Sequence, residues 1–139
     1  MDSFVVDSSV VIKWLREEGE ESVEEARRYL RELKNGRVQV SVPSVLYNEI
    51  VNVAVWDKHS LEITWRAGLT ALFGLPLQVF PMDLLFCLEV YELARELGLS
   101  GFDASYLVLA KRLNVKLLTA DRKLIEKGGE LVVPLADFV

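Results

Sequence analysis

Short apolar runs that alternate with helical segments constrain the fold of this chain more than any other feature. The runs fall at residues 3–6, 38–42, 77–80, 116–118 and 131–133, and a segment with helical periodicity separates each from the next. Strands that alternate with helices pair in parallel, because each helix carries the chain back to the start of the sheet. The sequence therefore predicts an α/β fold, with a parallel sheet covered by helices.

Several of the intervening helices have recognisable ends. A Glu-rich helix should stop at the Asn35-Gly36 pair, which is a common C-terminal signal. Ser8 or Ser9 can cap the first helix, Asp83 can cap another, and Ser100 has the spacing of a capping box with Asp103. The expected helices span residues 8–15, 20–34, 43–57, 60–73, 84–97 and 102–113, with a short last helix after residue 121.

The composition limits the chemistry that the chain can perform. It has 139 residues but one Cys and one His, so Cys/His zinc sites and His-based catalytic triads lack their parts. The formal net charge of −5 argues against a protein that coats nucleic acid through Lys and Arg. Catalysis would have to depend on carboxylates, hydroxyls and a bound cation.

No segment has the pattern of a targeting or membrane-spanning sequence. The amino terminus lacks the basic region of a signal peptide. The best apolar stretch, residues 71–82, is interrupted by Gly74, Pro76 and Pro81. We therefore expect a cytoplasmic protein with no membrane partner. The mean hydropathy of +0.23 is high for a small monomer and predicts that another chain covers part of the surface.

Acidic residues occur where parallel sheets bind their ligands. Asp7 directly follows the first predicted strand and Asp121 follows the fourth, and ligands bind beyond the carboxyl ends of such strands. Glu49 lies on the apolar stripe of its helix, where a carboxylate needs a partner such as Asn52. Asp103 opens a helix that is apolar nearly all round. Each residue also has a structural interpretation, because aspartates often cap helices and a glutamate at the stripe's edge can reach water.

If these four carboxylates converge, their mutual repulsion requires a counter-charge. Two unit charges about 4 Å apart repel by about 4 kcal/mol at an effective dielectric constant of about 20. Carboxylate oxygens without His or Cys select Mg²⁺ or Mn²⁺. Such an ion can bind a phosphodiester and lower the pKa of an attacking water, and it reverses the acidic field locally.

The order of these motifs resembles that of the PIN-domain ribonucleases, and most closely the toxins of VapBC toxin–antitoxin pairs. The resemblance covers residues 5 to about 133 and rests on Asp7-Ser8-Ser9, Pro43-Ser44-x-Leu46-x-x-Glu49-x-x-Asn52, Phe102-Asp103-Ala104-x-Tyr106 and Leu118-Thr119-Ala120-Asp121-x-x-Leu124. It implies one PIN-like domain over residues 1–139, with a three-layer α/β/α architecture and a central, mainly parallel sheet.

The resemblance also implies what the site residues do. The catalytic, metal-binding group that it implies for Mg²⁺ or Mn²⁺ is Asp7, Glu49, Asp103 and Asp121. Ser8 or Ser9 and Thr119 would orient these ligands or a metal-bound water, and Asn52 matches a less constant polar position.

Basic and aromatic residues outside the acidic group have open interpretations. Arg122 and Lys123, which directly follow Asp121, are candidate contacts to substrate phosphates or part of a solvated helix face. Trp56 is expected in the core, whereas Trp14 and Trp65 are candidates for an interface.

The expected function is a metal-dependent endoribonuclease, restrained as a toxin by a cognate antitoxin. The resemblance implies an RNA substrate, a homodimer and a VapB-like antitoxin whose tail lies in an apolar groove. We expect this groove on the first two helices and the helix after Pro43, at Val11, Leu15 and Tyr47. Two alternatives stay open: a PIN-like module that binds RNA or protein without cutting, and an aspartyl phospho-receiver domain. The latter would need an acidic pair before the first helix.

Overall fold

A five-stranded parallel sheet forms the centre of the protein. The computed structural model describes residues 2–16 and 20–138. The strand order is β3-β2-β1-β4-β5, with β1 at Asp2–Val6, β2 at Val38–Pro43, β3 at Leu77–Phe80, β4 at Lys116–Thr119 and β5 at Val132–Pro134. In the central strand, Phe4 lies opposite Val40 of β2 and Lys116 of β4. The predicted parallel sheet is confirmed.

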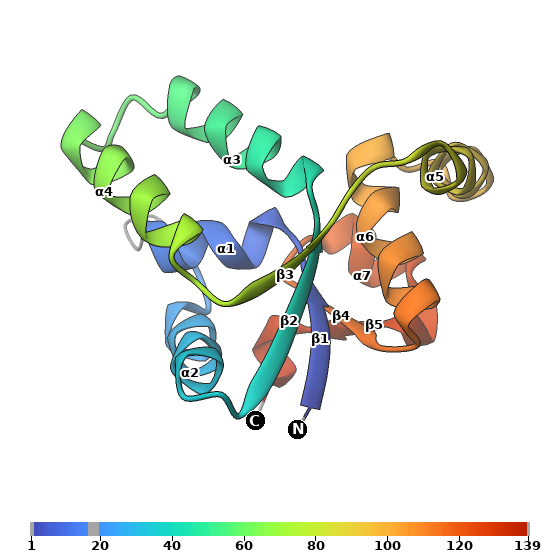
Figure 1. Cartoon of the computed structure of the whole chain (residues 1–139), viewed down its shortest axis with the longest axis horizontal. Helices are drawn as coiled ribbons and strands as arrows, with labels where there is room; N and C mark the ends of the chain where they lie inside the picture. The colour runs from blue at the N-terminus through green and yellow to red at the C-terminus, as the bar shows by residue number, and fades with distance from the viewer. Residues whose placement is uncertain (1, 17–19, 139) are drawn as a thin grey trace.

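Helices cover both faces of this sheet and produce the expected three-layer α/β/α arrangement (Figure 1). One layer contains α1 (Ser8–Leu15), α2 (Val23–Lys34), α3 (Val45–Trp56) and α4 (Glu62–Phe73). The other contains α5 (Leu84–Leu97), α6 (Gly101–Leu113) and α7 (Arg122–Lys127). The short turns η1 (Gly129–Leu131) and η2 (Leu135–Asp137) flank β5. In the described part of the chain, no helix combines the length and apolar character needed to cross a bilayer.

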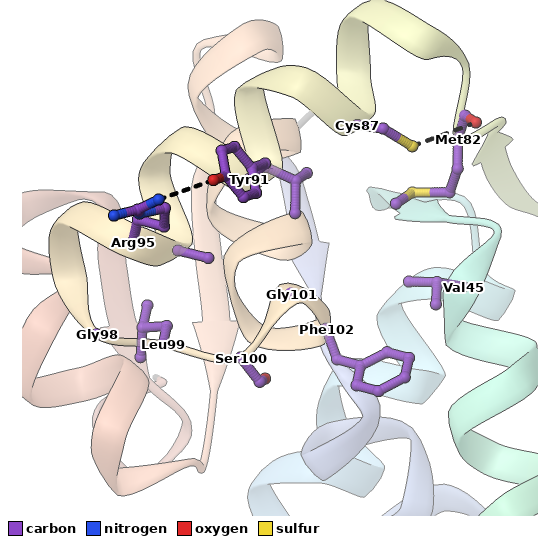
Figure 2. A pocket seen from close by; sticks show the side chains of 12 residues that line it. Val45, Met82, Cys87, Tyr91, Arg95, Gly98, Leu99, Ser100, Gly101 and Phe102 are labelled. Atoms are coloured by element: carbon purple, nitrogen blue, oxygen red, sulfur yellow. Dashed lines mark hydrogen bonds between the residues drawn. The ribbon is translucent and has the colours of Figure 1, made fainter.

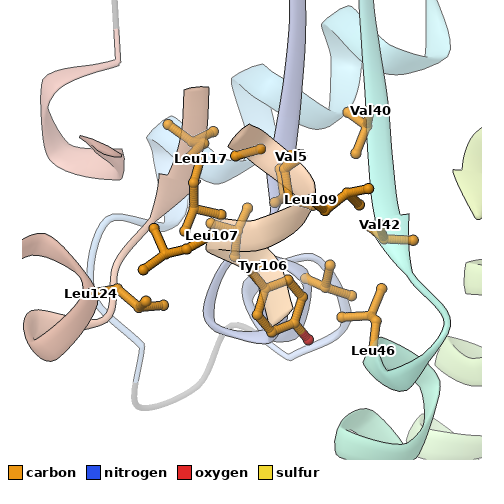
Figure 3. Close-up of a cluster of buried hydrophobic side chains, with 14 of the residues drawn as sticks. Val5, Val40, Val42, Leu46, Tyr106, Leu107, Leu109, Leu117 and Leu124 are labelled. Carbon is orange, nitrogen blue, oxygen red and sulfur yellow. The ribbon is translucent and has the colours of Figure 1, made fainter. Parts of the chain in front are cut away.

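The densest part of the core lies between the sheet and α6. This helix packs against β1, β2 and β4, and its side chains from Ala104 to Ala110 are all buried. Figure 3 shows them against the strand residues Val5, Val40, Val42 and Leu117. A helix that is apolar nearly all round is therefore buried nearly all round, as its sequence predicts.

The predicted caps are confirmed at two helices and wrong at one. Asp83 Oδ1 accepts the backbone N–H of Phe86 at 2.9 Å, and Ser100 Oγ accepts that of Asp103 at 3.0 Å. At α1, the N-cap position belongs to Asp7, and neither Ser8 nor Ser9 caps the helix. Both serine hydroxyls instead point to acidic side chains.

Three helices begin later than predicted. The Glu-rich helix α2 begins at Val23 and not at Glu20. At the other two, a polar turn or a strand takes up the preceding residues. Pro43 ends β2 opposite Phe80 of β3, and α3 begins only at Val45. Proline has no N–H to donate to a neighbouring strand, so it is excluded from strand interiors but tolerated at a strand terminus. Before α4, Asp57 Oδ1 accepts the N–H groups of His59 and Ser60, and the helix begins at Glu62.

Three expectations about which side chains are buried or exposed are wrong. Trp56 is 69% exposed, since it lies at the solvent-facing end of α3, whereas Trp65 is only 6% exposed. Trp65 can be buried because its indole N–H donates to Asp57 Oδ2 at 2.8 Å. Val11 is fully buried and therefore cannot line a surface groove. Trp14 is half-buried, and its indole N–H donates to the carbonyl of Ala26 at 2.9 Å.

Candidate functional site

The four predicted carboxylates come from four segments that meet at one edge of the sheet. Asp7 follows β1 and Asp121 follows β4, and these strands are neighbours in the sheet. Glu49 lies on α3, the helix that follows β2, and Asp103 lies in the first turn of α6. Parallel strands all end at the same edge, which explains how residues so distant in sequence come together.

Asp7 is almost fully buried, at 2% exposure. Its Oδ1 accepts a hydrogen bond from Ser9 Oγ at 2.6 Å, and its Oδ2 accepts one from Thr119 Oγ1 at 2.7 Å. Burial raises the pKa of Asp7 to about 7, against the effect of these two hydrogen bonds, and the charges of Asp121 and Glu49 add to the increase. A proton or a cation therefore stabilises this side chain.

Ser9 and Thr119 connect Asp7 to the turn that carries Asp121. Thr119 Oγ1 accepts the backbone N–H of Asp121 at 3.0 Å, and Ser9 Oγ accepts that of Ala120 at 2.9 Å. Each hydroxyl thus donates to Asp7 and accepts from the turn after β4. This geometry is what the predicted orienting role of the two residues requires.

Glu49 is half-buried and is held mainly by Tyr106, a residue that belongs to one of the sequence motifs but had no predicted role. Tyr106 Oη donates to Glu49 Oε1 at 2.5 Å, and Ser8 Oγ lies 3.5 Å from Oε2. Burial raises the pKa of Glu49, as do the charges of Asp103 and Asp121, while the Tyr106 hydrogen bond opposes the increase. The available signal was a tyrosine within an otherwise aliphatic buried helix. Tyr106, not Asn52, supplies the partner expected for Glu49.

Asp103 and Asp121 complete the acidic group. Burial and the charge of Asp121 raise the pKa of Asp103, and the positive charge of Lys123 lowers it. Asp121 also caps α7, since its Oδ1 accepts the N–H of Leu124 at 3.0 Å. Asp121 thus has a structural role and also contributes charge to the other three carboxylates.

Asn52 and Arg122 lie outside this connected group. Both side chains are exposed, and among residues 2–16 and 20–138 neither is hydrogen-bonded to any of the four carboxylates. Asn52 instead lines a surface hollow together with Trp56 and Asp57. Lys123, one residue beyond Arg122, is the basic residue whose charge acts on Asp103. Both basic residues follow Asp121 in sequence, but one step along a helix changes a side chain's direction, so the two are not equivalent contacts.

The donor chemistry of the acidic group suits a hydrated divalent cation. Its ligating atoms would all be carboxylate oxygens, which Mg²⁺ and Mn²⁺ prefer. Over the described ranges, no three His, Cys, Asp or Glu side chains form a group that could hold a metal ion. Mg²⁺ normally keeps several waters and binds through only one or two carboxylates. A divalent ion at this site would therefore be held partly through its water molecules.

An apolar groove lies beside the start of α6, the helix that carries Asp103. This groove, hereafter the α5–α6 groove, has a volume of about 610 Å³ and runs between α5 and the start of α6. Figure 2 shows Val45 and Phe102 at one end and Tyr91 with Arg95 at the other. Phe102 lies in the first turn of α6, as does Asp103 of the acidic group, but none of the four carboxylates lines the groove among the described residues.

Comparison with known proteins identifies the family. The sequence matches the PIN domain family over residues 4–130, a range that contains all four carboxylates. The chain belongs to the PIN domain family. This membership selects the PIN interpretation of the motifs over the phospho-receiver alternative.

Individual relatives of this PIN domain agree with that assignment. The chain is 44% identical over 46 residues to Ribonuclease VapC3 of Pyrobaculum aerophilum, a match that covers 33% of this chain and 35% of that relative. The chain thus spans about a third of the length of the curated relative it matches.

Two crystal structures have a similar fold. PAE2754 from Pyrobaculum aerophilum has a TM-score of 0.70 at 19% identity, with 97% of this chain and 92% of that chain covered. VapBC2 from Rickettsia felis, bound to a DNA fragment from their promoter, has a TM-score of 0.70 at 12% identity, with coverage of 95% and 98%. At such identities the likeness shows the fold alone.

Proposed function

We propose that this protein is a Mg²⁺- or Mn²⁺-dependent endoribonuclease that acts as the toxin of a toxin–antitoxin pair. One observation carries the proposal: four carboxylates from separate segments lie at one sheet edge, where each of three has its pKa raised by burial and by its acidic neighbours. A divalent cation is the simplest compensation for such a group. The identity with a segment of a protein named a ribonuclease supports RNA as the substrate.

In this proposal Asp7, Asp103 and Asp121 would hold the ion, partly through its water molecules, and Glu49 would bind it directly or through water or help to activate the attacking water. When bound, the ion supplies positive charge that binds the phosphodiester and lowers the pKa of a water molecule. Ser9 and Thr119 hold Asp7 from both of its oxygens. Ser8 lies beside Glu49, and Lys123 adds a positive charge near Asp103 that can contact substrate phosphate.

The proposed partners are a second copy of the chain and a VapB-like antitoxin. Large apolar side chains are exposed on α5, where Leu84 is 72% and Leu85 70% exposed, and near the α3–α4 connection, where Leu61 is 72% exposed. Exposed apolar surface of this kind is typical of protein interfaces. Light scattering of the purified chain, alone and with the antitoxin, measures both associations.

A cleavage assay with single-stranded RNA tests the proposed activity. Asp121→Asn and Asp83→Asn form a matched pair, because both aspartates cap a helix through Oδ1, at 3.0 and 2.9 Å. Asn can also cap a helix, so neither change should unfold the protein. We expect Asp121→Asn to abolish cleavage and Asp83→Asn to preserve it, with EDTA stopping the parent enzyme.

Three results would argue against this activity. Cleavage that survives EDTA would exclude the metal requirement, and an active Asp121→Asn variant would exclude the assigned site. RNA binding without cleavage by the parent in Mg²⁺ would favour the alternative of a non-cutting PIN-like module.

A further inference from the structure

We propose that Tyr106 is a positioning residue, whose hydroxyl holds the Glu49 carboxylate against the other acidic side chains and thereby sets the affinity of the site for divalent metal. The inference rests on the proposed function, because it concerns the same acidic group. It assigns a task to a residue that acts through Glu49.

The contact joins two layers of the fold. Tyr106 lies on α6 and is fully buried, whereas Glu49 lies on α3 in the opposite helical layer (Figure 1). Figure 3 shows the Tyr106 ring within the hydrophobic cluster, with its hydroxyl on the side of Leu46, one turn before Glu49. The 2.5 Å hydrogen bond to Glu49 Oε1 thus leaves the core and ends at the acidic site.

The position of Tyr106 on α6 lets this hydrogen bond fix the distance between the carboxylates of Glu49 and Asp103. Tyr106 follows Asp103 by three residues, so both lie on the same side of the helix. The helix is packed against three strands and is buried over most of its length. One rigid element therefore carries both Asp103 and the hydroxyl that binds Glu49, and it sets the position of one carboxylate relative to the other.

Electrostatic repulsion opposes this arrangement. The charges of Asp103 and Asp121 both act on Glu49, which is only half-buried and can turn towards water. Ser8 offers little restraint, since its hydroxyl is 3.5 Å from Oε2. Phenylalanine would fill the same space in the core, so packing alone does not require the hydroxyl. The hydrogen bond from Tyr106 is the contact that offsets the repulsion.

Tyr29 provides a matched control within the same chain. It is also fully buried, and it packs edge-on against Phe4 and Phe138. Among the residues described, its hydroxyl has no hydrogen-bond partner. Tyr29→Phe thus removes a buried hydroxyl without removing a contact to a carboxylate.

The test measures Mn²⁺ binding to the whole chain without RNA, by electron paramagnetic resonance. Tyr106→Phe should weaken Mn²⁺ binding by about 10-fold or more, the usual effect of losing a residue that orients a metal ligand. Tyr29→Phe should leave the affinity unchanged. Glu49→Gln should also weaken binding, and adding Tyr106→Phe to it should cause no further loss, because the hydroxyl acts through the carboxylate.

The outcomes separate this inference from the function on which it rests. Unchanged affinity in a folded Tyr106→Phe variant, or losses that multiply in the double variant, would overturn the positioning role while leaving the metal site intact. A parent protein that binds no Mn²⁺ would overturn both. Thermal unfolding in EDTA reports whether the variants fold. If Tyr106→Phe does not fold, Glu49→Asp is used in its place, because the shorter side chain withdraws the carboxylate from the Tyr106 hydroxyl. Unchanged Mn²⁺ affinity of Glu49→Asp also refutes the positioning role.

Discussion

Replacing Asp7 with Asn should stabilise the metal-free protein at alkaline pH. The pKa of Asp7 is about 7 in the fold, compared with 3.8 for an ordinary aspartate. At about 1.4 kcal/mol per pKa unit, this difference means that the charged side chain lowers the free energy of unfolding by about 4 kcal/mol. Asparagine has nearly the same shape and carries no charge, so it avoids this penalty.

The effect should depend on pH in one direction. Between the two pKa values the folded protein binds more protons at Asp7 than the unfolded chain does, so the stability of the parent falls as pH rises. The penalty is absent below about pH 4 and complete above about pH 7. Asparagine replaces one of the two carboxylate oxygens with an NH₂ group, which cannot accept the hydrogen bond from Ser9 or Thr119 at that position. This loss reduces the benefit, so we expect the free energy of unfolding to rise by about 2–4 kcal/mol.

Urea unfolding in EDTA, at about pH 8 and about pH 4, measures how much Asp7→Asn raises the free energy of unfolding. Asp83→Asn serves as the control, because Asp83 is an exposed aspartate outside the acidic group. A variant that is no more stable than the parent at the higher pH would refute the reasoning, as would an equal gain at both pH values. Saturating Mg²⁺ should stabilise the parent and reduce the advantage of Asp7→Asn.

Three further changes test the packing of the fold. Tyr29→Phe should raise the free energy of unfolding by about 1 kcal/mol, because it removes a buried hydroxyl that lacks a partner among the described residues; a loss of stability in denaturant titration would contradict this. Gly128→Ala should cost about 1–3 kcal/mol, since the new Cβ would lie 2.7 Å from the carbonyl oxygen of Leu124 and closer still to a methyl group of Val132. Gly101→Ala, with nothing within 4 Å of its Cβ, should be tolerated in the same calorimetric comparison. Leu46→Ala should lower the free energy of unfolding in urea by about 2–5 kcal/mol, because Leu46 is fully buried between α3 and the core. If Leu46→Ala lowered it no more than Leu84→Ala, a change at an exposed leucine, the packing of Leu46 would be unimportant.

The order of the elements could be predicted because each depends on local chemistry. The alternation of apolar runs with helical periodicity placed every strand within two residues of its observed bounds. Capping by Asp83 and Ser100 involves only neighbours in sequence, and both caps are present. Some errors arose where a contact between two elements decided the outcome. Trp65, for example, is buried because Asp57, at the end of another helix, accepts its indole N–H.

The candidate site divides in the same way. Asp7 and Asp121 could be singled out because a parallel sheet places every strand's carboxyl end at one edge. The resemblance implied orienting roles for Thr119 and for Ser8 or Ser9, but which carboxylate each hydroxyl holds depends on how separate elements pack. Asp7 is held by Thr119, 112 residues away, and Glu49 by Tyr106, 57 residues away.

The sequence by itself determined the strand order in the chain, the alternation with helices, and the presence of oxygen ligands without Cys or His partners. These features follow from periodicity and residue type, which the chain carries locally. Only the tertiary structure decided that Asp7 is buried, that Tyr106 holds Glu49, and that Asn52 and Arg122 are outside the connected group. Burial, hydrogen bonding and repulsion depend on distances between segments, and those distances exist only once the sheet and its helices have packed together.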